Sequence, residues 1–112
     1  MESILTTIKK LLGITADYKH FDTDIIVHIN TVLMALNQIG VGPTDPYLIT
    51  SEIETWDDFL GGAKNLEAVK TYIYLKVRLA FDPPANSSLI EAINRSINEL
   101  EWRLNAAAES SM

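Results

Sequence analysis

The residues with the most chemical potential are two histidines and two aspartates in the first third of the chain. His20 and His28 are the only histidines, and no third nitrogen ligand or well-spaced carboxylate completes a zinc set with them. Asp22 and Asp24 resemble the opening of a calcium-binding loop, but the glycine and the closing glutamate of such a loop are absent. Helix capping is the better interpretation of the aspartates. The sequence therefore predicts no metal site.

Nucleophilic catalysis and phosphate binding find equally little support. The chain has no cysteine, which excludes cysteine nucleophiles, thiolate metal sites and disulfides. Neither histidine belongs to a motif that pairs it with a serine or threonine nucleophile. Gly61, Gly62 and Lys64 have the composition of a phosphate loop but neither its spacing nor a preceding strand, so a turn is predicted. We expect a protein that is not an enzyme and that holds no cofactor.

Length and charge narrow the class of protein further. The 112 residues fit one domain. Fifteen acidic and nine basic side chains give a net charge of -6, and the basic residues are dispersed, whereas duplex DNA binding needs them grouped against phosphates. No secretory signal pattern opens the sequence, and no window reaches the roughly 18 apolar residues of a membrane span. We expect no membrane and no sequence-specific nucleic acid partner.

Four segments have the apolar periodicity of amphipathic helices. They cover about residues 2–12, 22–39, 66–81 and 88–104. Glycines end the first two segments, Gly13 among them, and two prolines end the third. Asp22, Thr23 and Asp24 offer an N-cap and first-turn acids for the second helix, while Ser88 and Glu91 have the spacing of a capping box for the fourth.

These segments predict a mainly α, single domain over residues 1–112 that resembles a four-helix bundle. The small, polar tail at about 105–112 should fray unless a partner orders it. Residues 41–62 lose the helical periodicity and contain two prolines and three glycines. We expect this stretch to form a long irregular arm that projects from the bundle between the second and third helices, since a loop of this length is usually functional or disordered.

Within the arm, residues 47–50 are β-prone and could pair with residues 53–55 as a short β-hairpin or edge strand. Thr55, followed by Trp56 and two aspartates, indicates the N-cap of a brief helical piece that ends at Gly61. Apolar side chains on so short and proline-broken a stretch need a neighbour. A β-prone arm can find one by adding to a strand of an adjacent subunit or partner.

Seven residues are candidates for contacts with other proteins. Those of the arm include one tryptophan, and those at the end of the last helix include the other, a residue type enriched at interface hot spots. Two interpretations stay open for both tryptophans, which are packing into the core of the monomer and contact with another subunit. The candidates are Tyr47, Leu48, Ile49, Trp56, Trp102, Arg103 and Leu104.

Several segments together resemble the small helical connector proteins of tailed phages, which complete the head and are often encoded in phages or prophages of Gram-positive bacteria. These segments are ESILTTIKKLLGI at 2–14, a second helix ending in NQIGVG, YLITSEIETWDDFLG at 47–61, LEAVKTYIYLKVRLAFDPP at 66–84 and ELEWRLN at 99–105. The resemblance covers about residues 2–105. Its most specific part is the tryptophan-bearing middle followed by the helix that ends in Phe81, Asp82, Pro83 and Pro84.

The resemblance implies a virion protein at the head-tail interface that is assembled in the host cytoplasm. Such connectors form a ring, typically of twelve copies, between the portal protein and the tail or a stopper protein, with a channel that passes DNA without reading it. An acidic protein suits a channel in which phosphates must slide. The alternatives are a small terminase-like or regulatory DNA-binding protein and a generic helical adaptor. A helix-turn-helix, however, needs a turn of about three or four residues, not the long arm found here.

Overall fold

Helices make up most of the chain in a computed structural model that describes residues 2–61 and 65–110. Within these ranges there are five: α1 (Ile4–Leu11), α2 (Asp22–Gln38), α3 (Trp56–Leu60), α4 (Leu66–Phe81) and α5 (Ser87–Ser110). No strand is present in the described residues, so the prediction of a mainly α, bundle-like fold is confirmed. Gly62 and Lys64 of the predicted turn, and residues 111–112 of the predicted tail, lie outside the described part.

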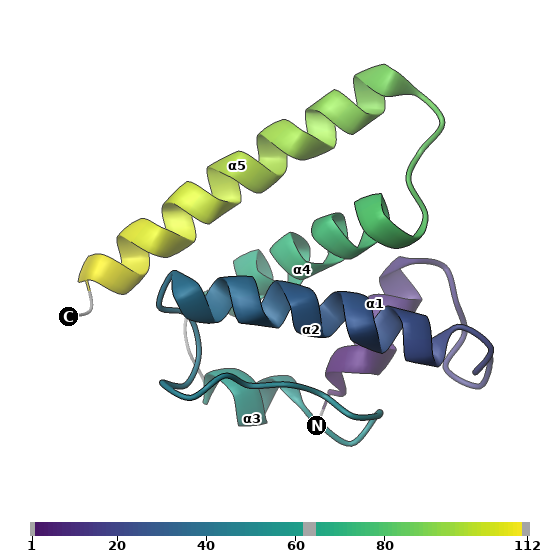
Figure 1. Cartoon of the computed structure of the whole chain (residues 1–112), viewed down its shortest axis with the longest axis horizontal. Coiled ribbons are helices and arrows are strands. Elements are labelled where there is room, and N and C mark those ends of the chain that lie inside the picture. The colour runs from purple at the N-terminus through teal and green to yellow at the C-terminus, as the bar shows by residue number, and fades with distance from the viewer. Residues whose placement is uncertain (1, 62–64, 111–112) are drawn as a thin grey trace.

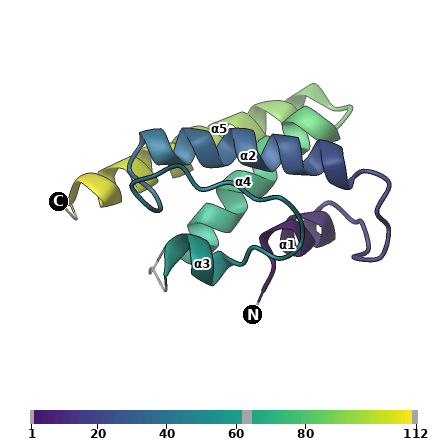
Figure 2. The same cartoon turned by 60° about the horizontal axis from the view of Figure 1, so that its bottom comes forward.

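The core forms around α4, which packs against α2 and α5, while α1 contacts both α2 and α4 (Figures 1 and 2). Each helix contributes residues spaced three or four apart, as one face of a helix requires. Burying each of these aliphatic or aromatic side chains stabilises the fold by roughly 1.5–3 kcal/mol before chain entropy is counted. The buried positions of the three long helices are Ile25, Ile29, Val32, Leu33, Leu36, Val69, Tyr72, Ile73, Val77, Ile93, Ile97 and Leu104.

Several of the predicted helix ends are confirmed. Thr55 caps α3 through a capping box in which its hydroxyl accepts from the Asp58 amide at 3.1 Å. Gly61 then ends α3 in the left-handed conformation. Gly13, which follows the C-cap of α1, also has a positive φ of 84°, a conformation that costs glycine little.

The predicted caps of two other helices are wrong. The N-cap of α2 is Phe21, without a side-chain hydrogen bond, although Asp22 and Asp24 lie in the first turn of α2, where acidic side chains were also expected. Helix α5 begins one residue before the predicted Ser88, because Asn86 takes the capping role. The Oδ1 of Asn86 accepts from the amides of Ser88 and Leu89 at 2.8 and 3.3 Å, and asparagine is as good an N-cap as serine.

Asp22 does not cap α2 but forms an ion pair with a buried lysine. Its carboxylate lies 2.7 Å from the Nζ of Lys9, a lysine that is only 2% exposed. The same Nζ donates to the carbonyls of Ala16 at 3.1 Å and Tyr18 at 2.7 Å. A buried ammonium is tolerated only with such partners. Lys9 therefore fastens the connection between α1 and α2 to both helices.

The arm does not project from the bundle, so that expectation is wrong. Two asparagines seven residues apart on one face of α2 hold its backbone. Asn30 donates to the Ile49 carbonyl at 2.9 Å and accepts from the Ile49 amide at 2.8 Å. Asn37 donates to the carbonyls of Pro43 and Thr44 at 3.1 and 3.2 Å. The arm consequently runs along α2 (Figure 2).

The described residues of the arm, 41–61, form no hairpin, because their backbone groups make hydrogen bonds with other segments. Ser3 and Thr55 form an isolated antiparallel bridge. It is flanked by hydrogen bonds from the Ile4 amide to the Glu54 carbonyl at 3.1 Å and from the Trp56 amide to the Glu2 carbonyl at 3.2 Å. The predicted partner for residues 53–55 was the arm itself, whereas the actual one is the start of the chain.

Residues 105–110 continue α5. Gly40, which follows the end of α2, has a φ of 88° and lies close to the end of α5. A Cβ atom added to Gly40 would lie 3.2 Å from the Cβ of Ala108. The end of the last helix therefore approaches the turn after α2. The mobility predicted for residues 105–112 stays a prediction that amide exchange can test.

Candidate protein interface

Among residues 2–61 and 65–110, the titratable side chains do not converge on a site for chemistry. In the described ranges, no three His, Asp or Glu side chains are grouped to hold a metal ion. His20 lies with its ring 4.8 Å from that of Phe21, and His28 lies 6.4 Å from Phe81. Both histidines thus belong to a small aromatic cluster.

Nor does any helix among residues 2–61 and 65–110 combine the length and apolar character needed to cross a membrane.

The seven interface candidates differ in exposure: three are buried, three are exposed and one is half-buried. Ile49, Trp56 and Leu104 are buried within the chain, with exposures of 2%, 3% and 1%. In contrast, Leu48 and Trp102 are 47% and 72% exposed, and Arg103 is also exposed. Tyr47 is half-buried. The three buried residues pack against other parts of the same chain, so they need no partner protein to cover them.

Trp56 lies where α1, α3 and α4 meet. Its indole Nε1 donates to the Thr7 hydroxyl at 2.9 Å, and the Nζ of Lys70 lies 5.7 Å from the centre of its ring. A buried tryptophan usually satisfies its N–H in this way. The structure accordingly supports the core interpretation of Trp56.

Tyr47 packs its ring 5.3 Å from that of Phe59. Burial, with the nearby carboxylates of Asp58 and Glu54 as smaller contributors, raises the pKa of its hydroxyl above the ordinary value. A tyrosine in this setting stays protonated and does not act as a base. Its role is to join the arm to α3.

Trp102 lies on the outer face of α5. The buried residues Ile93, Ile97 and Leu104 form one stripe of that helix, and at about 3.6 residues per turn Trp102 falls on the opposite side from the stripe. Next to it, Arg103 donates to the Glu99 carboxylate at 2.6 Å. The interpretation that Trp102 widens the core face is wrong, because its indole is mostly in solvent.

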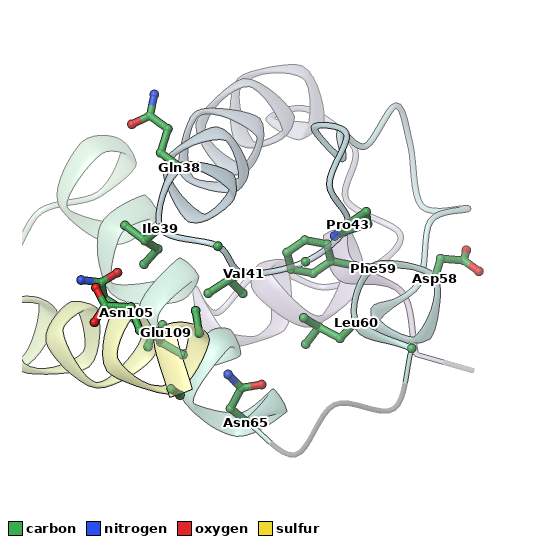
Figure 3. A pocket seen from close by; sticks show the side chains of 16 residues that line it. Gln38, Ile39, Val41, Pro43, Asp58, Phe59, Leu60, Asn65, Asn105 and Glu109 are labelled. Carbon is green, nitrogen blue, oxygen red and sulfur yellow. The ribbon is translucent and has the colours of Figure 1, made fainter. Parts of the chain in front are cut away.

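A hollow of about 1090 Å³ opens between the end of α2, the arm, α3 and the end of α5 (Figure 3). Its described walls include the apolar side chains of Val41, Phe59, Leu60 and Leu104. Asp58 and Glu109 contribute carboxylates, but no basic or histidine side chain among the described residues lines it.

One exposed residue was missed in the sequence. Ile53 is 77% exposed, more than any other large apolar side chain of the described chain. The signal in the sequence is an isoleucine between two glutamates, Glu52 and Glu54. The expected short strand at residues 53–55 gave no reason to single out the Ile53 side chain as exposed.

A family model described as phage connector protein matches residues 4–111. Searches of curated proteins and of solved structures gave no match.

Proposed function

This chain belongs to the phage connector protein family, and we propose that it is the non-enzymatic subunit that joins the portal of a filled phage head to the tail. Membership of the family gives it a structural, connector-type role. The helical fold and the absence of converging catalytic groups among the described residues support the same role. In this proposal the portal protein lies on one side of the subunit, and a tail-side connector or stopper protein lies on the other.

We propose further that the subunits form a ring of about twelve copies around a channel for DNA, as related connectors do. The acidic charge of -6 supports a channel that releases DNA easily. The free protein should accordingly bind random duplex DNA weakly. A mobility shift at submicromolar protein in physiological salt would instead favour the terminase-like alternative.

The observation that carries the docking proposal is the exposure of Trp102. A tryptophan that is 72% exposed on the side of α5 opposite the core contributes little to folding. Tryptophan and arginine are the residue types most enriched at interface hot spots, and Arg103, the next residue of α5, is also exposed. We therefore propose that the outer face of α5 around Trp102 contacts the portal.

Sedimentation of the protein with its cognate portal ring tests this proposal. The wild-type chain should co-sediment with the portal, and Trp102→Ala should bind about tenfold more weakly or worse. Val27→Ala is the matched control, because Val27 is also a largely exposed apolar residue, at 58%, but lies on α2. Equal binding by all three proteins would remove Trp102 from the docking surface, and no binding by the wild type would refute the portal role.

A further inference from the structure

The tip of the arm is a rigid turn at residues 50–54 that holds Ile53 in solvent. The carboxylate of Glu54 accepts from the Thr50 amide at 3.0 Å, the Thr50 hydroxyl at 2.7 Å and the Ser51 amide at 3.2 Å. The Ile53 amide donates to the Ser51 hydroxyl at 3.2 Å. Hydrogen bonds to a carboxylate are stronger than neutral ones, so the turn is well fixed.

The hydrogen bonds of this turn fix its backbone, but they do not explain why an isoleucine is exposed on it. Single exposed apolar residues are common on protein surfaces, but turn tips normally carry Gly, Pro, Asn, Asp or Ser. Here a network of four hydrogen bonds presents a branched aliphatic side chain that is 77% exposed. A turn whose backbone is already held in place loses little entropy when a partner binds it. Ile53 is therefore suited to be an anchor.

The charge around Ile53 defines the surface it can meet. Residues 41–61 contain five carboxylates and no lysine, arginine or histidine. Two of the carboxylates, Glu52 and Glu54, flank Ile53 directly. Glu52 lies 3.2 Å from the Nζ of Lys19, but its side chain is more than half exposed and can also meet a basic group of another chain. A complementary surface has an apolar depression for the isoleucine and basic side chains at its edge.

Such a surface lies between α4 and α5. A groove of about 250 Å³ there has Leu75 and Leu100 as its apolar lining and Arg103 at its edge, together with Thr71, Ser96 and Glu99. Thr71, Leu75 and Arg78 are four and three residues apart, so Arg78 continues the α4 side of the groove by one turn. Glu99 already pairs with Arg103, and the exposed guanidinium has further N–H groups for a second carboxylate.

We propose that the turn at 50–54 of one subunit inserts Ile53 into the α4/α5 groove of the next copy. In the view of Figure 1 most of α5 lies along the upper edge of the molecule and the arm along the lower edge, although the end of α5 and the start of the arm line one hollow. The turn at 50–54 and the α4/α5 groove are thus two different surfaces of the chain, as a head-to-tail contact requires. A contact between two different surfaces of the same chain closes into a ring when the rotation allows. The proposal rests on the proposed function, in that it assumes that copies of the chain assemble.

Cysteine cross-linking tests the contact directly, since the chain has no cysteine of its own. Ile53→Cys combined with Ser96→Cys, oxidised on the cognate portal and also in concentrated free protein, should give a ladder of trimers and larger species on a non-reducing gel. Ile53→Cys combined with Val27→Cys is the matched control and should stop at dimers. Ile53→Asp should raise the concentration needed for ring assembly about tenfold, while Val27→Asp should not.

The outcomes separate this contact from the portal role. If wild-type protein binds the portal but the 53/96 pair gives no ladder, the contact is refuted and the portal role stands. A ladder in concentrated protein that fails to bind the portal supports the contact and refutes the portal role. If the protein neither binds the portal nor forms a ladder, both the portal role and the subunit contact are refuted. A ladder with the 53/27 control pair as well would show that the cross-links are not specific to the groove, and this would refute the contact.

Discussion

Replacing the two tryptophans by alanine, one at a time, should separate folding from docking. Trp56 is 3% exposed and its indole donates to Thr7, so Trp56→Ala should lower the free energy of unfolding by roughly 3–5 kcal/mol. For a chain of 112 residues, each kcal/mol shifts Tm by about 4 °C. Trp56→Ala should therefore melt roughly 12–20 °C below the wild type.

Trp102→Ala should behave differently. Because Trp102 is 72% exposed, its removal should change the free energy of unfolding by no more than about 0.5 kcal/mol, which is roughly 2 °C in Tm. Each variant keeps a single tryptophan, so fluorescence adds an independent readout. The emission of Trp56 alone should be blue-shifted and protected from acrylamide, whereas that of Trp102 alone should be red-shifted and readily quenched.

Thermal and urea melts of the monomer decide the matter. If Trp102→Ala loses as much stability as Trp56→Ala, Trp102 belongs to the core and the proposed docking surface is unsupported. A small effect of Trp56→Ala would contradict the packing of α1, α3 and α4 described above.

Three further predictions concern the connections that hold the fold. Lys9→Ala leaves Asp22 without its partner and should destabilise the protein by roughly 3 kcal/mol, whereas Lys9→Met combined with Asp22→Leu should recover most of the loss, as urea unfolding can show. Asn30→Ala removes both hydrogen bonds to the Ile49 backbone and should destabilise by about 1–3 kcal/mol. Faster hydrogen exchange at the Ile49 amide would confirm release of the arm, and unchanged exchange would argue against the clamp.

The third prediction concerns pH. Burial acts to raise the pKa of Glu54, but hydrogen bonds from Thr50 and Ser51 outweigh it and hold the pKa below its ordinary 4.5. A lowered pKa means that the carboxylate stabilises the turn fully above pH 4.5 and loses this effect as the pH falls through the lowered pKa. Subunit assembly through Ile53 should weaken as the pH falls below 4.5 and through the lowered pKa of Glu54. Glu54→Gln, which has no carboxylate to protonate at this position, should remove this weakening at low pH.

The helices could be predicted from sequence because local signals were strong. Apolar periodicity and the double proline fixed α4 as Leu66–Phe81, and Thr55 and Gly61 marked both ends of α3. The caps of α2 and α5 could not be resolved, because several capping residues stand next to each other in the sequence. Which one acts depends on tertiary contacts such as the pairing of Asp22 with Lys9.

The path of the arm could not be predicted for a similar reason. Its attachment depends on two asparagines of α2 that bind backbone groups of the arm, and on the pairing of Ser3 with Thr55. None of these long-range contacts leaves a periodic pattern. The same limit explains why Trp56 and Trp102 were treated alike from sequence, although the fold buries one and exposes the other.

Electron microscopy of the cognate portal ring with and without this protein tests the connector role most directly. The account predicts an added ring of density at one end of the portal, coaxial with its channel, which is lost with Trp102→Ala and retained with Val27→Ala. Portal particles that look the same with and without the wild-type protein, at concentrations well above those used for binding, would contradict it.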